Sequence, residues 1–192
     1  NPATGRFLSV DPVPNGGSNA YVYCSGDPVN CRDTSGTLDY SFKFDLGNGT
    51  RSAKGLFRYW MDHFGKIFPL AGRANKITHV GQKMDLRDSV FGIKINFNVR
   101  VAYIGSNTLK LGTRKGSVVH GRNSYIQFTI TKGRTDRIGM GRLYLTTHGH
   151  TAGDSWMDDC IDSWTCPITG WMYRKGAHDT WEKLASNLRR HV

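Results

Sequence analysis

The sequence is short of several residue types, and each shortage excludes a class of protein. Of 192 residues only four are cysteines and six are prolines, and glutamate occurs once, as Glu182. The cysteine spacing does not match a zinc site, in which two cysteines separated by two to four residues act together with a second pair of ligands. No run of eighteen apolar residues is present, so no membrane-spanning helix is expected. Sequence signatures of zinc deaminases, serine hydrolases, zinc peptidases and P-loop proteins are missing too.

The four cysteines fall into two close pairs, Cys24 with Cys31 and Cys160 with Cys166. Each pair is near enough in sequence for a local disulfide, and the alternative is ordinary buried or free thiols. The chain begins with Asn1 and shows no signal-peptide pattern, so we expect it to be a fragment of a longer protein.

Positive charge and aromatic residues are abundant. The net charge is +11, and residues 1–36 contribute −1, so residues 37–192 carry +12. This excess predicts an anionic partner, which could be nucleic acid, anionic lipid or an acidic protein. With 38% hydrophobic residues, including 5 Trp, 8 Tyr and 9 Phe, the chain can bury a core and is not disordered.

Residues 1–36 differ from the rest in composition. The pieces "DPV", "NGG", "GDPVN" and "DTSG" are typical of tight turns, because Pro presets one turn dihedral and Gly and Asn tolerate positive φ. Between them, "RFLSV" and "AYVYC" predict two short strands. These cannot bury a core alone, so the segment is expected to pack on structure that precedes it.

The opening residues resemble a known family. "NPATGRFLSVDP" and the later "NAYVYCSGDPVN" are similar to the ordered signatures of the Rhs/YD-repeat-associated core. The resemblance covers residues 1 to about 36. It implies that this segment ends a large β shell and that residues 37–192 form a variable C-terminal domain, very often a toxin delivered into a competing cell. Asn1 replaces the usual Asp, and Thr34 replaces the usual Pro, which puts self-cleavage of the core in doubt.

The family context also implies partners and a place of action. The partners are the upstream Rhs shell of the same polypeptide and an acidic cognate immunity protein. The protein would be secreted or delivered from the cell surface and act in the cytoplasm of the target cell.

Hydrophobic spacing predicts an α+β domain over residues 37–192. We expect a strand over 38–47, a helix from Ala53 to Phe68 ended by Pro69, and an irregular basic segment over 70–88. Antiparallel strands are expected in the segments 90–105, 108–113, 116–121, 124–131 and 141–148, with Tyr103 among the residues facing the core. A short helix near 156–164 and a C-terminal helix follow, the latter begun by a capping-box-like pair, Asp179 and Glu182. The domain is therefore an antiparallel sheet flanked by N- and C-terminal helices.

The polar face of this sheet is the candidate functional surface. It carries cations and tyrosines that suit RNA, whose phosphates meet cations and whose bases stack on rings. The candidate nucleic-acid-binding residues are Lys94, Arg100, Tyr125 and Tyr144. His120, His148 and His150 lie at strand ends and could act as general base and acid on a ribose 2′-OH, with Arg142 holding the phosphate. This predicts a ribonuclease that needs no metal and no cofactor.

Other interpretations stay open. The polar face can be an ordinary solvated surface, and His63 and His178 are expected to be structural. Asp154, Asp158 and Asp162 share one face of a predicted helix, with Asp159 beside them; they form either a solvated acidic face or a Mg²⁺ site of a metal-dependent nuclease. An ADP-ribosyltransferase is disfavoured by the single glutamate. A non-enzymatic module that binds anionic lipid would also explain the positive charge and the tryptophans, although no long amphipathic segment is present.

Overall fold

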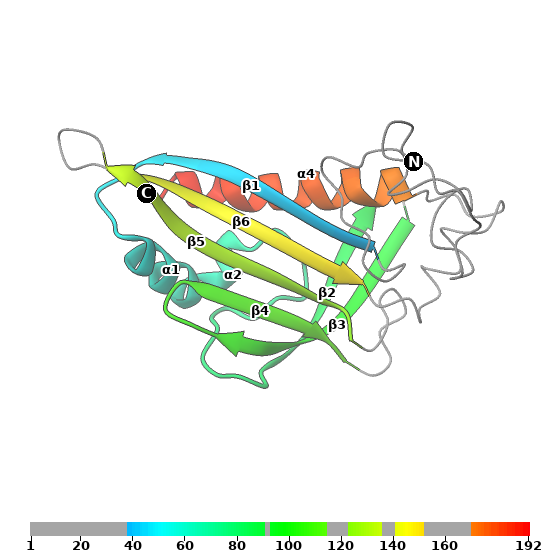
Figure 1. Cartoon of the computed structure of the whole chain (residues 1–192). Coiled ribbons are helices and arrows are strands. Elements are labelled where there is room, and N and C mark those ends of the chain that lie inside the picture. Colours follow the sequence, from blue (N-terminus) through cyan, green and yellow to red (C-terminus); the bar gives the residue numbers. More distant parts are fainter. Residues whose placement is uncertain (1–37, 91–92, 115–122, 136–140, 152–169) are drawn as a thin grey trace, which may run out of the picture.

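The computed structural model describes residues 38–90, 93–114, 123–135, 141–151 and 170–192, which form one antiparallel sheet and three helices. The six strands lie in the order β1-β6-β5-β4-β3-β2 (Figure 1). The strands are β1 (Leu38–Asn48), β2 (Lys83–Val90), β3 (Ile93–Ile104), β4 (Thr108–Thr113), β5 (Tyr125–Thr135) and β6 (Gly141–Thr151). The helices are α1 (Ala53–Asp62), α2 (Phe64–Ile67) and α4 (Gly170–Arg189). The α+β class and the antiparallel sheet predicted from the sequence are confirmed.

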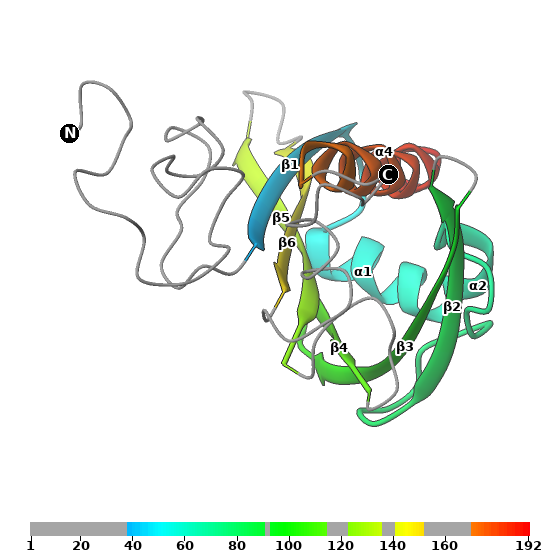
Figure 2. The same ribbon diagram turned by 90° about the vertical axis from the view of Figure 1, so that its right-hand side faces the viewer.

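The sheet curls strongly and encloses helices on its inner side. Figure 2 shows α1 within the curl and α4 lying across its open side, near β1. Strands β2 to β6 form a meander, whereas β1 joins the far edge beside β6. The first strand of the domain therefore pairs with the last strand. The chain between β1 and β2 crosses from one edge of the sheet to the other through α1 and α2.

Helix α1 begins where the sequence predicts a helix. The Ser52 side chain accepts a hydrogen bond of 3.0 Å from the backbone N–H of Gly55, which caps the first turn. The predicted helix Ala53–Phe68 is interrupted at His63, whose backbone N–H bonds to the carbonyls of Tyr59 and Trp60. The helix restarts as α2, and the break lets both pieces turn buried residues toward the sheet.

Aromatic rings fill the space between the helices and the sheet. Trp60 and Phe68 each meet the Phe128 ring edge-to-face, at centroid distances of 5.7 and 6.0 Å. Trp181 of α4 contacts Phe128 at 4.9 Å and Phe68 at 6.1 Å. The Trp181 indole N–H also donates to the hydroxyl of Tyr40, 3.2 Å away. Rings from β1, β5, α1, α4 and the end of α2 thus form one continuous core.

Part of the segment predicted to be irregular is a strand. Residues 83–90 form β2, which pairs with β3 over its whole length, for example Leu86 with Phe97. Among residues 83–88 of this strand, whose burial is described, Met84 and Leu86 are buried and the others are charged. The sequence signal was weak because this is an edge strand with few apolar residues; along its free edge, Ala71 forms a short bridge with Arg87.

The expected core position of Tyr103 is wrong. Val99 and Val101 are buried as predicted, but the register between β3 and β4 shifts between Val101 and Tyr103. Because side chains alternate along a strand, this irregularity reverses the direction of the residues that follow. The Tyr103 side chain is consequently 53% exposed and lies opposite Lys110 on the outer face.

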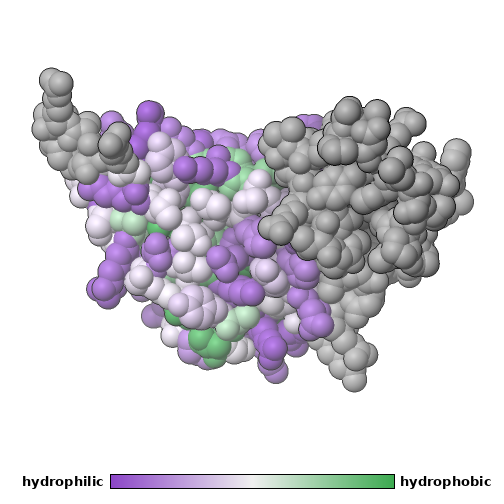
Figure 3. Space-filling view, in the orientation of Figure 1, coloured by the Kyte–Doolittle hydropathy of each residue, from purple (hydrophilic) through white to green (hydrophobic). Residues whose placement is uncertain are grey.

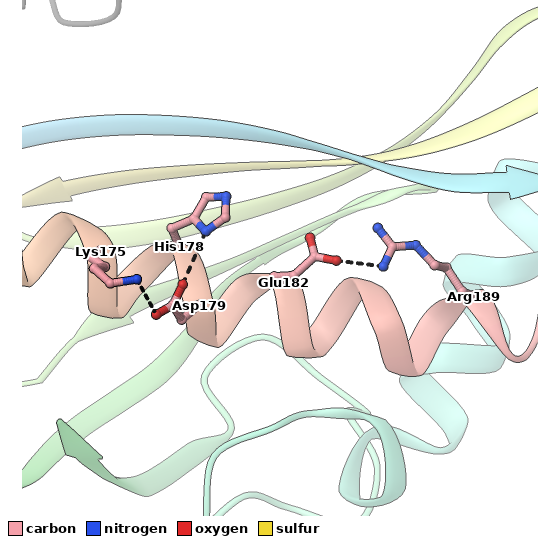
Figure 4. A network of polar contacts seen from close by, with 5 residues as sticks. All are labelled: Lys175, His178, Asp179, Glu182 and Arg189. Carbon is pink, nitrogen blue, oxygen red and sulfur yellow. Dashed lines mark hydrogen bonds and ion pairs between the residues drawn. The ribbon is translucent and has the colours of Figure 1, made fainter. Parts of the chain in front are cut away.

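Helix α4 begins at Gly170, so the expected start at Asp179 is wrong. Asp179 lies within the helix, where Lys175 and His178 both turn toward its carboxylate, and Glu182 pairs separately with Arg189 (Figure 4). The hydrogen bond from Lys175 lowers the pKa of the Asp179 carboxyl, and the bond to His178 adds to this effect. These groups are exposed, so the pairs add little to stability.

Gly149 of β6 marks a place where the sheet has no room for a side chain. A Cβ atom there would overlap the ring of Tyr40 on the neighbouring strand, whereas one at Gly112 would meet only the Cβ of Ala102, 3.5 Å away. We expect Gly149→Ala to lower the free energy of unfolding by about 1–3 kcal/mol, as overpacking does. Urea denaturation of this variant beside Gly112→Ala measures the difference. Equal stability of the two variants would contradict this account of Gly149.

Candidate functional site on the outer face of the sheet

The outer face of the sheet carries the polar residues of β1, β5 and β6. Strand alternation and the observed register place directly paired residues on the same face. His150 pairs with Asp39 on one side and with Tyr125 on the other, and His148 pairs with Ser41 and Gln127. Figure 3 shows this face, where hydrophilic side chains lie among side chains of intermediate hydropathy and a few hydrophobic ones.

Five residues of the outer face form what we call the histidine cluster: Asp39, Lys110, Tyr125, His148 and His150. The Tyr125 ring stacks on His150 with a centroid distance of 5.2 Å and meets the edge of His148 at 5.8 Å. The Lys110 ammonium lies 3.4 Å from the centre of the same ring. Four strands therefore contribute to one compact group of ionisable side chains.

Asp39 fixes the orientation of His150. The Nδ1 atom of His150 lies 2.7 Å from Oδ1 of Asp39, and the two side chains are 25% and 24% exposed. Because the carboxylate can only accept, Nδ1 carries the proton, and Nε2 of the neutral ring can take up a second one. The pair thus fixes the tautomer and the orientation of the His150 ring, and it leaves Nε2 as the ring atom that is free of this contact.

Asp39 and Lys110 were missed by the sequence reasoning. Asp39 lies 111 residues before His150 and meets it only because β1 pairs with β6. Lys110 stands on the predicted strand 108–113, but its approach to Tyr125 depends on the pairing of β4 with β5. The only available signal was that both residues alternate with buried neighbours and so face outward.

Arg142 lies apart from the histidines. It is six residues from His148 along β6, which corresponds to about 20 Å. Its guanidinium pairs with Asp45 through an Nε–Oδ2 distance of 2.7 Å. Nearby, the Tyr144 ring is covered by the Lys43 ammonium at 4.4 Å. The predicted phosphate-holding cation is thus far from the predicted acid and base, whereas Lys110 lies against Tyr125 beside them.

The remaining predicted residues are distributed as follows. Arg100 is exposed on β3, opposite Gly112 of β4 and Lys83 of β2. Lys94 belongs to β3, but its side chain lies outside the described residues, as does all of His120. The aspartates at 154, 158 and 162, all four cysteines and the predicted strand 116–121 also lie outside the described ranges.

The two histidines expected to be structural have contacts of that kind. His63 holds the break between α1 and α2, and its Nδ1 bonds to the Tyr59 carbonyl at 2.9 Å. His178 packs against Phe42 at 5.1 Å and Phe44 at 5.4 Å.

The described residues hold neither a metal-ligand group nor a membrane-spanning helix. In these parts of the chain, no three His, Cys, Asp or Glu side chains come together as metal ligands. None of the described helices has the length and apolar character needed to cross a bilayer.

Comparison with solved structures identifies the fold. The structure matches the Zhui aromatase/cyclase from Streptomyces sp. R1128 with a TM-score of 0.51 and 9% identity, over 81% of this chain and 93% of that one. The two proteins share a fold. At this identity the likeness concerns the fold alone.

Two further structures show lower similarity. A START superfamily protein from Mycobacterium smegmatis has a TM-score of 0.49 and 18% identity, over 80% of this chain and 96% of that one. Ara h 8.0201 has a TM-score of 0.43 and 9% identity, over 80% and 97%. No family model and no curated protein matches the sequence.

Proposed function

We propose that the chain is the C-terminal part of an Rhs-type toxin and that its effector domain is a metal-independent ribonuclease. The observation that carries the activity is the histidine cluster, in which two histidines, a carboxylate and a lysine meet on the outer face. The toxin context rests on the signatures in residues 1–36 and the strongly basic domain behind them. The core on the inner face of the sheet holds packed aromatic rings, whereas the ionisable groups of the cluster lie on the outer face.

Each residue of the cluster has a role in the proposed reaction. Nε2 of His150 removes the proton of a ribose 2′-OH, and the oxygen attacks the adjacent phosphorus. Protonated His148 gives its proton to the leaving 5′-oxygen as the P–O bond breaks, so the products are a 2′,3′-cyclic phosphate and a 5′-OH. Lys110 stabilises the charge that develops on the phosphoryl oxygens. Asp39 orients His150 through the bond to Nδ1.

The spacing of the two histidines suits this division of roles. Being two residues apart on β6, they lie on the same face with Cα atoms about 7 Å apart. A phosphodiester placed between them could meet one ring at the attacking oxygen and the other at the leaving oxygen. The chemistry needs no metal, because histidine exchanges protons near neutral pH.

A direct assay of the 192-residue chain tests the proposal. Total RNA, tRNA and DNA are incubated with the purified protein, with and without EDTA, and product ends are determined. We expect RNA to be cut to 2′,3′-cyclic phosphate ends in both conditions. DNA should stay intact because it lacks the attacking 2′-OH.

Two results would overturn the proposal. Uncut RNA, together with leakage of vesicles made of anionic lipid, would favour the membrane-binding module. RNA cleavage abolished by EDTA would move the chemistry to the aspartates at 154, 158 and 162.

A further inference from the structure

A second basic feature lies on the outer side of β2 and β3. An open groove of about 640 Å³ runs between these strands and the loop that follows α2. Its charged and amide lining includes Arg73, Lys83, Arg87, Asn96 and Asn98. We call this the β2–β3 groove. Nothing in the proposed reaction uses it.

The lining of the groove includes a side chain held by hydrogen bonds, and it carries more positive than negative charge. Arg73 is held by bonds from its guanidinium to the carbonyls of Gly65 and Leu70, at 2.6 and 2.7 Å. The one acidic group among the lining residues, Asp85, is paired with Arg114 at 3.0 Å. Lys83 and Arg87 are exposed at the rim. This combination suits phosphate groups, which cations attract and amides can bond.

A row of paired residues links the groove to the histidine cluster. The pairing runs from His150 to Tyr125, Gly112, Arg100 and Lys83, so all five lie on the outer face. Tyr125 and Lys83 are three strand spacings apart, about 15 Å between backbones. Gly112 leaves open backbone in the middle of the row, and Arg100 adds a cation beyond it.

The exposed ring of Tyr103 stands beside this row. It is 53% exposed and lies opposite Lys110 of the histidine cluster. Such a ring can stack on a base only if that base is not already stacked in a duplex. The sheet also curls between β5 and β2, as Figure 2 shows, and a stiff duplex does not follow such a bend over so short a distance.

We propose that the β2–β3 groove binds the phosphates of a single-stranded RNA whose scissile bond lies at the histidine cluster. The RNA strand runs around the outer face of the sheet, past Arg100 and Tyr103. This rests on the proposed ribonuclease function for the position of the scissile bond, but the groove's binding of RNA can be measured without cleavage.

Binding of a 2′-O-methyl RNA 20-mer, which lacks the attacking hydroxyl, gives the first test. The Lys83→Ala/Arg87→Ala double variant should bind more weakly than the parent chain. The slope of log affinity against log salt should become shallower by about 1.4, the loss of two phosphate contacts to a single strand. Tyr103→Ala should weaken binding roughly 5- to 100-fold. The double variant Lys54→Ala/Lys183→Ala removes the same charge from exposed positions on α1 and α4 and should bind like the parent.

Cleavage kinetics separate the groove from the catalytic centre. With a long RNA the Lys83→Ala/Arg87→Ala variant should show a raised KM and an unchanged kcat, and with a dinucleotide it should match the parent. An unchanged salt slope, or an equal loss in the control variant, would refute the groove. Equally tight and equally groove-dependent binding of a 20-base-pair RNA duplex would refute the single-stranded assignment. Groove-dependent binding without any cleavage would uphold the groove and refute only the ribonuclease.

Discussion

RNA cleavage by the His148→Ala and His150→Ala variants should be slower by about 10²–10⁴-fold, as expected when a general acid or base is lost. Both rings lie on the outer face, beside Tyr125, and neither belongs to the hydrophobic core. The fold and the affinity for non-cleavable RNA should therefore persist. Single-turnover cleavage of a labelled RNA, together with thermal unfolding, measures both properties.

Two further variants test whether the loss of RNA cleavage is specific to the histidine cluster. His79→Ala removes an exposed histidine from the loop before β2 and should cleave RNA at the parental rate. Asp39→Ala should lower kcat less than His150→Ala does and leave KM unchanged, because Asp39 acts through His150. If His148→Ala and His150→Ala retained parental rates while His79→Ala did not, the histidine cluster would not be the active site.

The largest expected effect on stability comes from Trp181. Its ring contacts Phe68 and Phe128, and its N–H donates to the buried Tyr40 hydroxyl. Trp181→Ala leaves a cavity at the junction of α4 and the sheet and should lower the free energy of unfolding by about 3–5 kcal/mol. Urea denaturation followed by circular dichroism gives the value.

Two other variants serve as controls for the stability of Trp181→Ala. Trp181→Phe keeps an aromatic ring but lacks the indole N–H, so it should cost clearly less than alanine. Val80→Ala, at a side chain 57% exposed, should change stability by at most about 0.5 kcal/mol. A Trp181→Ala variant as stable as Val80→Ala would show that α4 does not depend on this contact.

The sequence predicted those elements whose residues alternate or recur with one strong period. β6 alternates buried Leu143 and Leu145 with polar neighbours, and α1 repeats apolar residues at helical spacing. β2 was missed because two buried residues in an edge strand give little periodicity. The first half of α4 was missed because it contains Gly176 and its large apolar residues are consecutive, at 171–173, rather than at helical spacing. Tyr103 was misplaced because a register shift leaves no mark in composition.

The candidate site could be predicted only in part, for a related reason. His148 and His150 were identified from their own strand, since strand ends and chemistry are local properties. Their partners Asp39 and Lys110 belong to strands that are brought close by pairing, and pairing partners depend on the whole fold. Arg142 shows the opposite error, because a shared face does not imply a short distance along an extended strand.

The pairing of β1 with β6 also sets the time at which the proposed activity can appear. During synthesis Asp39 leaves the ribosome before His150, and 111 more residues must follow before the two can pair. Pairings between such distant segments form slowly because a long loop must close first. A nascent or half-folded chain therefore holds two histidines with no carboxylate to orient them. If the proposed ribonuclease function holds, the producing cell meets a complete histidine cluster only after the last strand of the sheet has docked against the first.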